Sequence, residues 1–92
     1  MSRYDWDTKK ARVNLAKHGI SFEEAEAVPD TDLARWMPDP RHRNDPDRFW
    51  IIGFSDLGTL LVVVTSERGP RPRIISARRA TKRERHAYEA RS

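Results

Sequence analysis

Residues 60–65 read Leu-Leu-Val-Val-Val-Thr, the strongest strand signal in this chain of 92 residues. A short continuous apolar run that is rich in β-branched residues is typical of a central strand in a sheet. Turn residues flank it on both sides, with Ser-Asp-Leu-Gly at 55–58 and a Gly- and Pro-containing segment at 67–72. This pattern predicts an antiparallel neighbour on each side of the strand.

Further strands are predicted on either side of this run. Residues 48–54 and 73–78 each carry an apolar stretch, and each connects to the central strand through one of the short turns. Residues 31–37 predict a weaker first strand, and the polar, proline-rich segment 38–47 is interpreted as a mobile loop. The sheet is therefore predicted to be an antiparallel meander of four strands.

Capping residues mark three helices. Asp7 precedes a run of helix-forming residues, and Gly19 is a typical stop at its end. Ser21-Phe22-Glu23-Glu24 is a capping box that begins a short second helix, and Thr81-Lys82-Arg83-Glu84 is another that begins a C-terminal helix. The order ααββββα, with the helices on one face of the sheet, predicts a single α+β domain over residues 1–92.

Charge is distributed unevenly along the chain. Residues 66–92 contain nine Lys or Arg and three Asp or Glu, a net charge of +6, whereas residues 1–65 contain nine and eleven, a net charge of −2. A basic half on a small chain favours an anionic partner, above all nucleic acid. There is no cysteine, which excludes disulfides and cysteine zinc sites, and no apolar run approaches the roughly 20 residues of a membrane helix. We therefore expect a cytoplasmic protein without a membrane partner.

The first candidate site lies around the turn that follows the central strand. Glu67 and Arg68 come at the end of that strand, and Arg73 and Arg78 lie on the strand that pairs with it. A carboxylate beside guanidinium groups suits acid–base chemistry on a bound phosphate, although a surface ion pair is the simpler interpretation. Because side chains alternate along a strand, Arg73 and Arg78 are predicted to point to opposite faces unless the strand bulges.

Two helices supply further candidates. His18 follows Lys17 at the end of the first helix, where an imidazole can act as general acid or base; a histidine that only caps the helix is the alternative. Lys82 and Arg85 form a basic stripe on the last helix, and a solvated helix face is the alternative there. The sequence has no HExxH, H-x-H or Gly-rich phosphate loop, so no metal and no cofactor are predicted.

The tryptophans and one further histidine are given no role in chemistry. Trp6, Trp36 and Trp50 are interpreted as core anchors rather than as platforms for base stacking. His42 lies in the polar loop and has no partner at metal-ligand spacing. No candidate residue is therefore assigned to that loop.

Several blocks of residues in this chain occur together in one known family. The most specific are Lys17-His18-Gly19-Ile20-Ser21-Phe22-Glu23-Glu24-Ala25 and Ile74-Ile75-Ser76-Ala77-Arg78. The others are Trp6-Asp7, Asn14-Leu15, Ile52-Gly53-Phe54-Ser55, Leu60-Leu61-Val62-Val63-Val64, Glu67-Arg68-Gly69 and Glu84-Arg85. In this order, and over nearly the whole chain, they resemble the BrnT family, the ribonuclease toxins of bacterial type II toxin–antitoxin systems.

The resemblance implies a RelE-like α+β fold and metal-independent cleavage of RNA that stops translation and growth. It also implies a BrnA-like antitoxin with a ribbon-helix-helix part, and promoter DNA that is bound only through the toxin–antitoxin complex. Members of the family often carry histidine or another ring-bearing side chain at the position of Thr65. Threonine, in contrast, does not transfer protons near neutral pH. The segment 29–47 does not align with the family pattern.

RNA cleavage of this kind gives each candidate a role. The 2′-OH of the RNA attacks the phosphate, so one group must remove its proton and another must protonate the leaving oxygen. The assignments are Glu67 or His18 for proton transfer, Arg68 and Arg78 for the phosphate, and Lys17, Arg73, Lys82 and Arg85 for RNA binding. A non-catalytic basic module that binds an acidic antitoxin or DNA is the alternative, because phosphate binding and catalysis use the same arginines.

Overall fold

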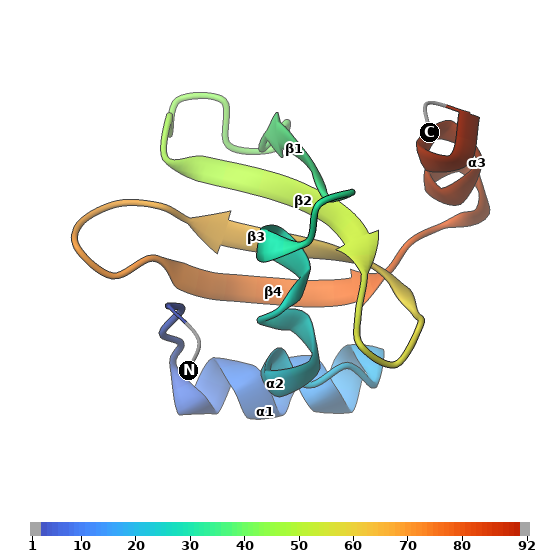
Figure 1. The fold of residues 1–92 in the computed structure, drawn as a ribbon. Coiled ribbons are helices and arrows are strands. Elements are labelled where there is room, and N and C mark those ends of the chain that lie inside the picture. Colours follow the sequence, from blue (N-terminus) through green and yellow to red (C-terminus); the bar gives the residue numbers. More distant parts are fainter. Residues whose placement is uncertain (1–2, 91–92) are drawn as a thin grey trace.

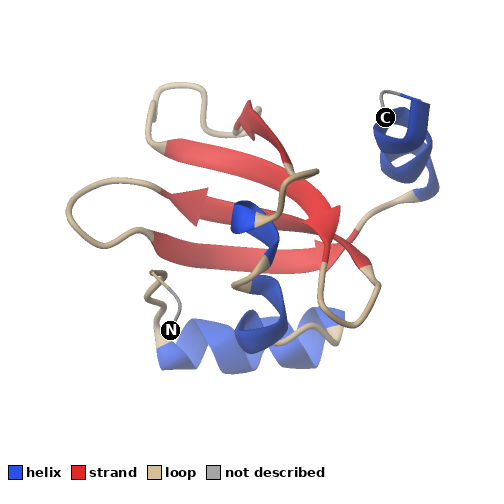
Figure 2. Cartoon of the chain, in the orientation of Figure 1, coloured by secondary structure: helices blue, strands red, loops and turns tan. Residues whose placement is uncertain are grey.

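The computed structural model describes residues 3–90, which form three α-helices, one short 3₁₀ helix and a four-stranded sheet (Figures 1 and 2). The elements in chain order are α1 (Thr8–His18), α2 (Phe22–Ala25), η1 (Val28–Asp30), β1 (Arg35–Pro38), β2 (Arg48–Phe54), β3 (Leu60–Ser66), β4 (Arg73–Arg79) and α3 (Lys82–Ala90). The predicted order ααββββα and the α+β class are confirmed.

The sheet is an antiparallel meander in the order β1-β2-β3-β4, as predicted. β3 pairs with β2 on one side and with β4 on the other, which makes it a central strand, and most of its side chains are buried. The turn between β2 and β3 closes at Gly58, whose φ is 78° and whose N–H donates to the carbonyl of Ser55. Glycine reaches this left-handed conformation without a Cβ clash, so a glycine suits the backbone that this turn requires at position 58.

Caps define both ends of α1, as the sequence indicated. The carboxylate of Asp7 accepts hydrogen bonds from the backbone N–H groups of Lys9 at 2.8 Å and Lys10 at 3.1 Å. At the other end Gly19 has a φ of 72°, and its N–H donates to the carbonyl of Leu15. Because glycine adopts this conformation at little cost, the helix ends there and the chain turns toward α2.

One face of the sheet is covered by α1, α2 and η1 (Figure 1). The buried residues of this core are Tyr4, Ile20, Phe22, Ala25, Val28, Ile51, Leu61, Val63, Ile74 and Ala77. Trp6 packs edge-on against Phe22 at 5.9 Å, so it is a core anchor as predicted. Trp36 is not, because 41% of it is exposed and its ring N–H donates to the carbonyl of Pro29.

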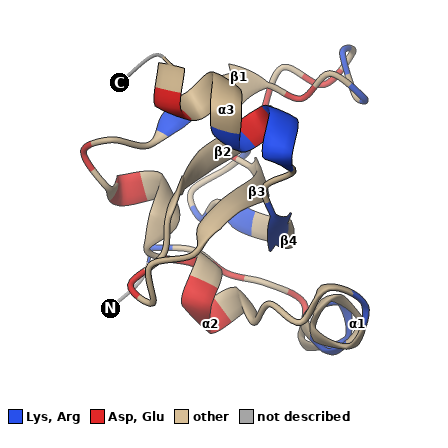
Figure 3. Ribbon diagram, turned by 90° about the vertical axis from the view of Figure 1, so that its right-hand side faces the viewer, with Lys and Arg blue, Asp and Glu red and all other residues tan. Residues whose placement is uncertain are grey.

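The prediction that all helices share one face of the sheet is wrong, because α3 lies over the opposite face (Figure 3). Tyr88 of α3 packs edge-on against Phe54 at 5.9 Å. Ile52 and Val62 are cross-strand partners on this outer face, where they alternate with the core residues of the same strands. The apolar runs of β2 and β3 therefore supply both faces, and the outer face needs a cover of its own.

β1 is shorter than the strand predicted over residues 31–37. Residues 31–34 instead form a turn after η1, in which the N–H and the hydroxyl of Thr31 both donate to the carbonyl of Val28. The turn therefore uses backbone hydrogen-bonding groups that a strand would need for pairing with its neighbour. β1 ends at Pro38, which lacks an N–H and is tolerated because β1 is an edge strand.

The outer edge of β4 is closed by groups from the N-terminal segment and from α1. Asp5 makes two backbone hydrogen bonds of 2.9 Å beside Arg73. Farther along, the buried amide of Asn14 accepts from the N–H of Ala77 at 3.1 Å and donates to its carbonyl at 2.8 Å, as a neighbouring strand would. The same amide donates to the carbonyl of Ile20 at 3.0 Å. These bonds attach α1 to β4 and give partners to backbone groups of Pro72, Ile74 and Ala77 along this edge.

Replacing Asn14 with alanine should therefore destabilise the fold, since it leaves the buried N–H and C=O of Ala77 without partners. We expect the free energy of unfolding to fall by about 2–4 kcal/mol, which urea unfolding followed by circular dichroism will measure. Leu15→Ala is the matched control on the same helix, because Leu15 is 50% exposed and its loss should cost less than about 1 kcal/mol. Equal losses in the two variants would contradict the role given to Asn14.

Candidate functional site

The structure does not gather the predicted site residues at one place. They form three groups: Glu67, Arg68 and Arg73 around the β3–β4 loop, Arg78, Lys82 and Arg85 around the start of α3, and Lys17 and His18 at the end of α1. The first two groups lie at opposite ends of β4, and at about 3.3 Å per residue the strand between Arg73 and Arg78 spans roughly 15 Å. Glu67 and Arg68 are therefore remote from Arg78.

A bulge places Arg73 and Arg78 on the same face of the sheet. The pairing of β3 with β4 shifts between Val64 and Thr65, which leaves Ile75 as an extra residue on β4. The alternation of side chains between the two faces therefore shifts by one residue at Ile75, and Arg73 points to the same face as Arg78. The sequence allowed the two arginines to share a face only if the strand bulged, and it does.

Glu67 is occupied by three donors at the end of β3. Its carboxylate accepts hydrogen bonds from the hydroxyls of Thr65 at 2.7 Å and Tyr4 at 2.9 Å, and from the guanidinium of Arg3 at 3.3 Å. Burial and the hydrogen bond to Glu67 raise the pKa of Tyr4 well above its usual range, so its hydroxyl remains a donor. Thr65 is fully buried, and its hydroxyl holds the carboxylate of Glu67 through this hydrogen bond from the interior.

Arg68 points toward the loop between β1 and β2. Its guanidinium forms ion pairs with Asp47 at 3.2 Å and with Asp45 at 3.4 Å, although 69% of the arginine side chain is exposed. Exposed pairs of this kind contribute less than about 1 kcal/mol. The guanidinium therefore remains available to an anion that reaches this loop.

Arg78 is bound to α3 through two hydrogen bonds. Its Nη1 and Nη2 donate to the two carboxylate oxygens of Glu84 at 2.8 and 3.0 Å. Glu84 also accepts from the N–H of Thr81, which in return caps the helix with its hydroxyl, so the predicted capping box is confirmed. The hydrogen bonds from Arg78 lower the pKa of Glu84 to about 2. The same guanidinium lies over the ring of Trp50, 5.3 Å from its centre.

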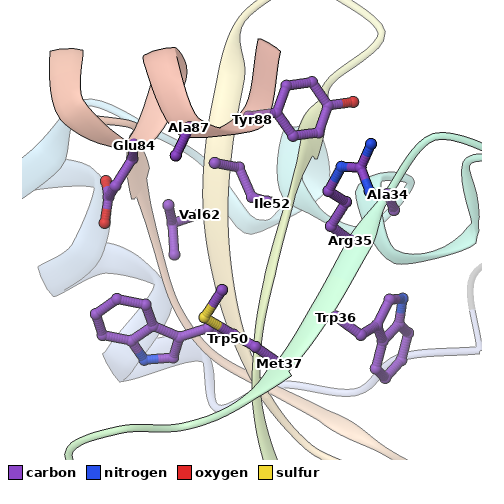
Figure 4. Close-up of a pocket in the computed structure, with 10 residues that line it drawn as sticks. All are labelled: Ala34, Arg35, Trp36, Met37, Trp50, Ile52, Val62, Glu84, Ala87 and Tyr88. Atoms are coloured by element: carbon purple, nitrogen blue, oxygen red, sulfur yellow. The ribbon is translucent and has the colours of Figure 1, made fainter. Parts of the chain in front are cut away.

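A hollow of about 500 Å³ lies between α3 and the outer face of the sheet (Figure 4). It is lined by Ala34, Arg35, Trp36, Met37, Trp50, Ile52, Val62, Glu84, Ala87 and Tyr88. In the figure Trp50 and Met37 lie at one end of the hollow, and Tyr88 and Arg35 lie at the other. Aromatic rings close to guanidinium groups suit a flat aromatic group such as a nucleobase.

A second hollow, of about 340 Å³, lies between α1 and β4, and we call it the α1–β4 groove. It is lined by Lys9, Lys10, Val13, Asn14, Lys17, His18, Ile75 and Ser76. Within residues 3–90 none of its three lysines enters an ion pair, whereas Arg68, Arg78 and Arg85 each face a carboxylate. Basic segments of α1, of the end of β4 and of the start of α3 lie on one side of the molecule (Figure 3). Lys17 and His18, both predicted site residues, are thus together in a groove of unpaired lysines.

One pair of residues was not predicted. Nδ1 of His42 lies 3.1 Å from a carboxylate oxygen of Asp39, whose side chain is 1% exposed. The backbone N–H of Arg41 and the guanidinium of Arg48 bind the same carboxylate. The segment interpreted as a mobile loop is instead organised around this buried group. The only sequence signal was the Asp-x-x-His spacing, which by itself is too common to indicate a site.

Two further features concern metal and membrane binding. Among residues 3–90, no cluster of three or more His, Asp or Glu side chains is arranged to hold a metal ion. No helix in that part of the chain has the length and apolar character needed to cross a membrane.

Comparison with known families identifies the family to which the chain belongs. A family profile described as "Ribonuclease toxin, BrnT, of type II toxin-antitoxin system" matches residues 6–84. The chain belongs to the BrnT family. The resemblance carried by the sequence blocks is confirmed, and the chain is a ribonuclease toxin whose substrate class is RNA and whose partner is an antitoxin.

A solved structure supports the same assignment. The 1.1 Å crystal structure of the Brucella abortus ribonuclease toxin, BrnT, matches with a TM-score of 0.67 and 27% sequence identity, over 86% of this chain and 96% of that one. The α+β arrangement described above is therefore that of a BrnT toxin. No curated protein sequence matches this chain significantly.

The ion pair between Glu84 and Arg78 should make the stability of this BrnT-family toxin depend on pH. The pKa of Glu84 is about 2 in the folded chain, below its ordinary value of 4.5, so the stabilisation is complete above about pH 4.5 and is lost as the pH falls through 2. We expect wild type to exceed Glu84→Gln by about 1–2 kcal/mol in unfolding free energy at pH 7, and by much less at pH 2, where about half of the Glu84 carboxyl groups are protonated.

Urea unfolding at stepped pH measures this difference. Glu89→Gln is the control, because Glu89 forms only an exposed pair with Arg85 at 3.7 Å, and its variant should follow wild type at every pH. A difference between wild type and Glu84→Gln that is as large at pH 2 as at pH 7 would contradict the prediction.

Proposed function

We propose that this BrnT-family chain cleaves RNA without a metal ion and that cleavage arrests translation and growth. The attacking group is the 2′-OH of the substrate itself. The observation that supports this most strongly is the α1–β4 groove, where three lysines outside any ion pair within residues 3–90 meet an imidazole. Lysines bind the phosphates of RNA, and an imidazole transfers protons near neutral pH.

Cleavage by this route needs two proton transfers and no further reactant. A base takes the 2′-OH proton as O2′ bonds to phosphorus, and an acid gives a proton to O5′ as the P–O5′ bond breaks. The products are a 2′,3′-cyclic phosphate and a 5′-OH end. Each proton transfer typically contributes about 10²–10⁴-fold, and cations on the phosphate stabilise the charge that develops there.

His18 is the better placed of the two predicted proton carriers. It lines the groove beside Lys17, whereas the carboxylate of Glu67 already accepts three hydrogen bonds. We therefore assign proton transfer to His18, and binding of the cleaved phosphate to Lys17 with Lys9 and Lys10. Glu67 is assigned a positioning role, because it ties the N-terminal segment that precedes α1 to the end of β3.

From the groove the RNA crosses β4 toward the hollow beneath α3. Ser76 lines the groove, and Arg78 lies two residues farther along on the same face of β4. Arg78 stacks on Trp50, which lines the hollow, so a phosphate and the neighbouring base each find a suitable group. Lys82 and Arg85 add positive charge where α3 borders this path.

We further propose that a BrnA-like antitoxin with a ribbon-helix-helix part neutralises the toxin in the cytoplasm, and that the complex binds its own promoter DNA. Membership in a toxin–antitoxin family supports an antitoxin partner. The chain carries a formal net charge of +4, which an acidic antitoxin surface would complement.

His18→Ala should lower RNA cleavage by about 10²–10⁴-fold, because it removes the group assigned to proton transfer. Cleavage of purified RNA in the presence of EDTA and growth after induced expression are the measurements. His86→Ala is the matched control, since His86 is exposed on α3 and lines no hollow described here. Wild-type cleavage by His18→Ala would remove His18 from the mechanism. Wild type that binds RNA without cutting it would favour the non-catalytic basic module instead.

Lys17→Ala should weaken the binding of single-stranded RNA and reduce its salt dependence. We expect the slope of log affinity against log salt to fall by about 0.7, the value for one phosphate contact to a single strand. The measurement uses fully 2′-O-methylated RNA, which has no 2′-OH and cannot be cut. Arg12→Ala removes a charge from the same helix outside the groove lining, so equal changes in both variants would show that the RNA lies elsewhere.

A further inference from the structure

The segment between β1 and β2 is built around one buried carboxylate. Asp39 is 2% exposed and accepts hydrogen bonds from the N–H of Arg41 at 2.8 Å, from Nδ1 of His42 at 3.1 Å and from Nε of Arg48 at 3.4 Å. Burial alone would raise the pKa of this carboxyl, but the hydrogen bonds and the adjacent charges outweigh burial and lower it. Asp39 is therefore an anion at neutral pH.

The buried anion determines how His42 is presented. An ionised carboxylate only accepts hydrogen bonds, so the hydrogen between the two groups must lie on Nδ1 of His42. Nε2 then faces away from Asp39, on a side chain that is 50% exposed. When the ring is protonated, Nε2 becomes a hydrogen-bond donor with a positive charge.

His42 borders a hollow of about 370 Å³ that is mainly basic, and we call it the loop hollow. Its lining is Arg41, His42, Arg43, Asn44, Asp45 and Arg68. Arg68 is paired with Asp45 and Asp47, but Arg41 and Arg43 enter no ion pair in the part of the chain that the structure describes. The arginines of the hollow therefore outnumber its nearby carboxylates, since Arg48 and Asp39 beneath it offset one another.

We propose that the loop hollow is a phosphate-binding site, in which Arg41, Arg43 and Nε2 of His42 hold a phosphate group of RNA. The choice of RNA as the source of the phosphate rests on the proposed function. Guanidinium groups match the geometry of phosphate oxygens, and a protonated imidazole adds a charge-assisted hydrogen bond. The loop hollow shares no lining residue with the α1–β4 groove, so it binds a phosphate away from the cleaved bond.

Titration of the whole chain with inorganic phosphate, followed by the NMR signals of His42 and of the arginine side chains, tests the site. His42→Ala should weaken phosphate binding about tenfold or more, as expected for the loss of one charge-assisted hydrogen bond. His86→Ala is the matched control on α3 and should bind phosphate as wild type does.

A second variant and a second probe make the outcome decisive. Arg43→Ala removes an exposed side chain without disturbing Asp39, and it should also weaken phosphate binding. Unchanged binding in both His42→Ala and Arg43→Ala overturns the site. Fully 2′-O-methylated single-stranded RNA should shift the same NMR signals as phosphate does. RNA that binds without shifting them overturns the assignment to RNA, and RNA cleavage by wild type, measured separately, would still support the proposed function.

Discussion

Closure of the outer edge of β4 is the constraint on which the rest of this structure depends. An edge strand presents N–H and C=O groups that must find partners or attract other chains. The amide of Asn14 satisfies both groups of Ala77, and Asp5 pairs with the start of the strand. These bonds place α1 along β4, and so they create the groove in which Lys17 and His18 meet. A hydrogen-bonding requirement of the sheet thus positions the charged groups assigned to RNA.

Neighbouring carboxylates decide which cations remain available for a ligand. The excess of positive charge in the sequence lies in the C-terminal part, yet Arg78 is bound by Glu84 and Arg68 by Asp45 and Asp47. The lysines that line the α1–β4 groove come from the N-terminal helix, in the half of the chain with a net negative charge. Attraction between charges depends on their distance and surroundings, so the net charge of a segment is a weaker guide than the pairing of each cation.

Local signals in the sequence predicted the elements better than their arrangement. The caps at Asp7 and Ser21 act within three residues, and both helices begin where these caps predict. The first strand was misplaced because the donors of Thr31 bond within a turn. The face predicted for α3 was wrong. A continuous apolar run shows that a strand is central, but it does not show which helix covers each face of the sheet.

By itself the sequence determined the helix caps, the three long strands, the meander and the family, because these depend on near neighbours or on blocks of matching residues. Only the tertiary structure decided which site residues meet. Glu67 is bound by Tyr4 from 63 positions away, and an extra residue at Ile75 decides which way Arg73 points. His42 gains an oriented ring only because Asp39 is buried beside it. Burial, register and long-range pairing arise when the chain folds, so no local pattern of residues encodes them.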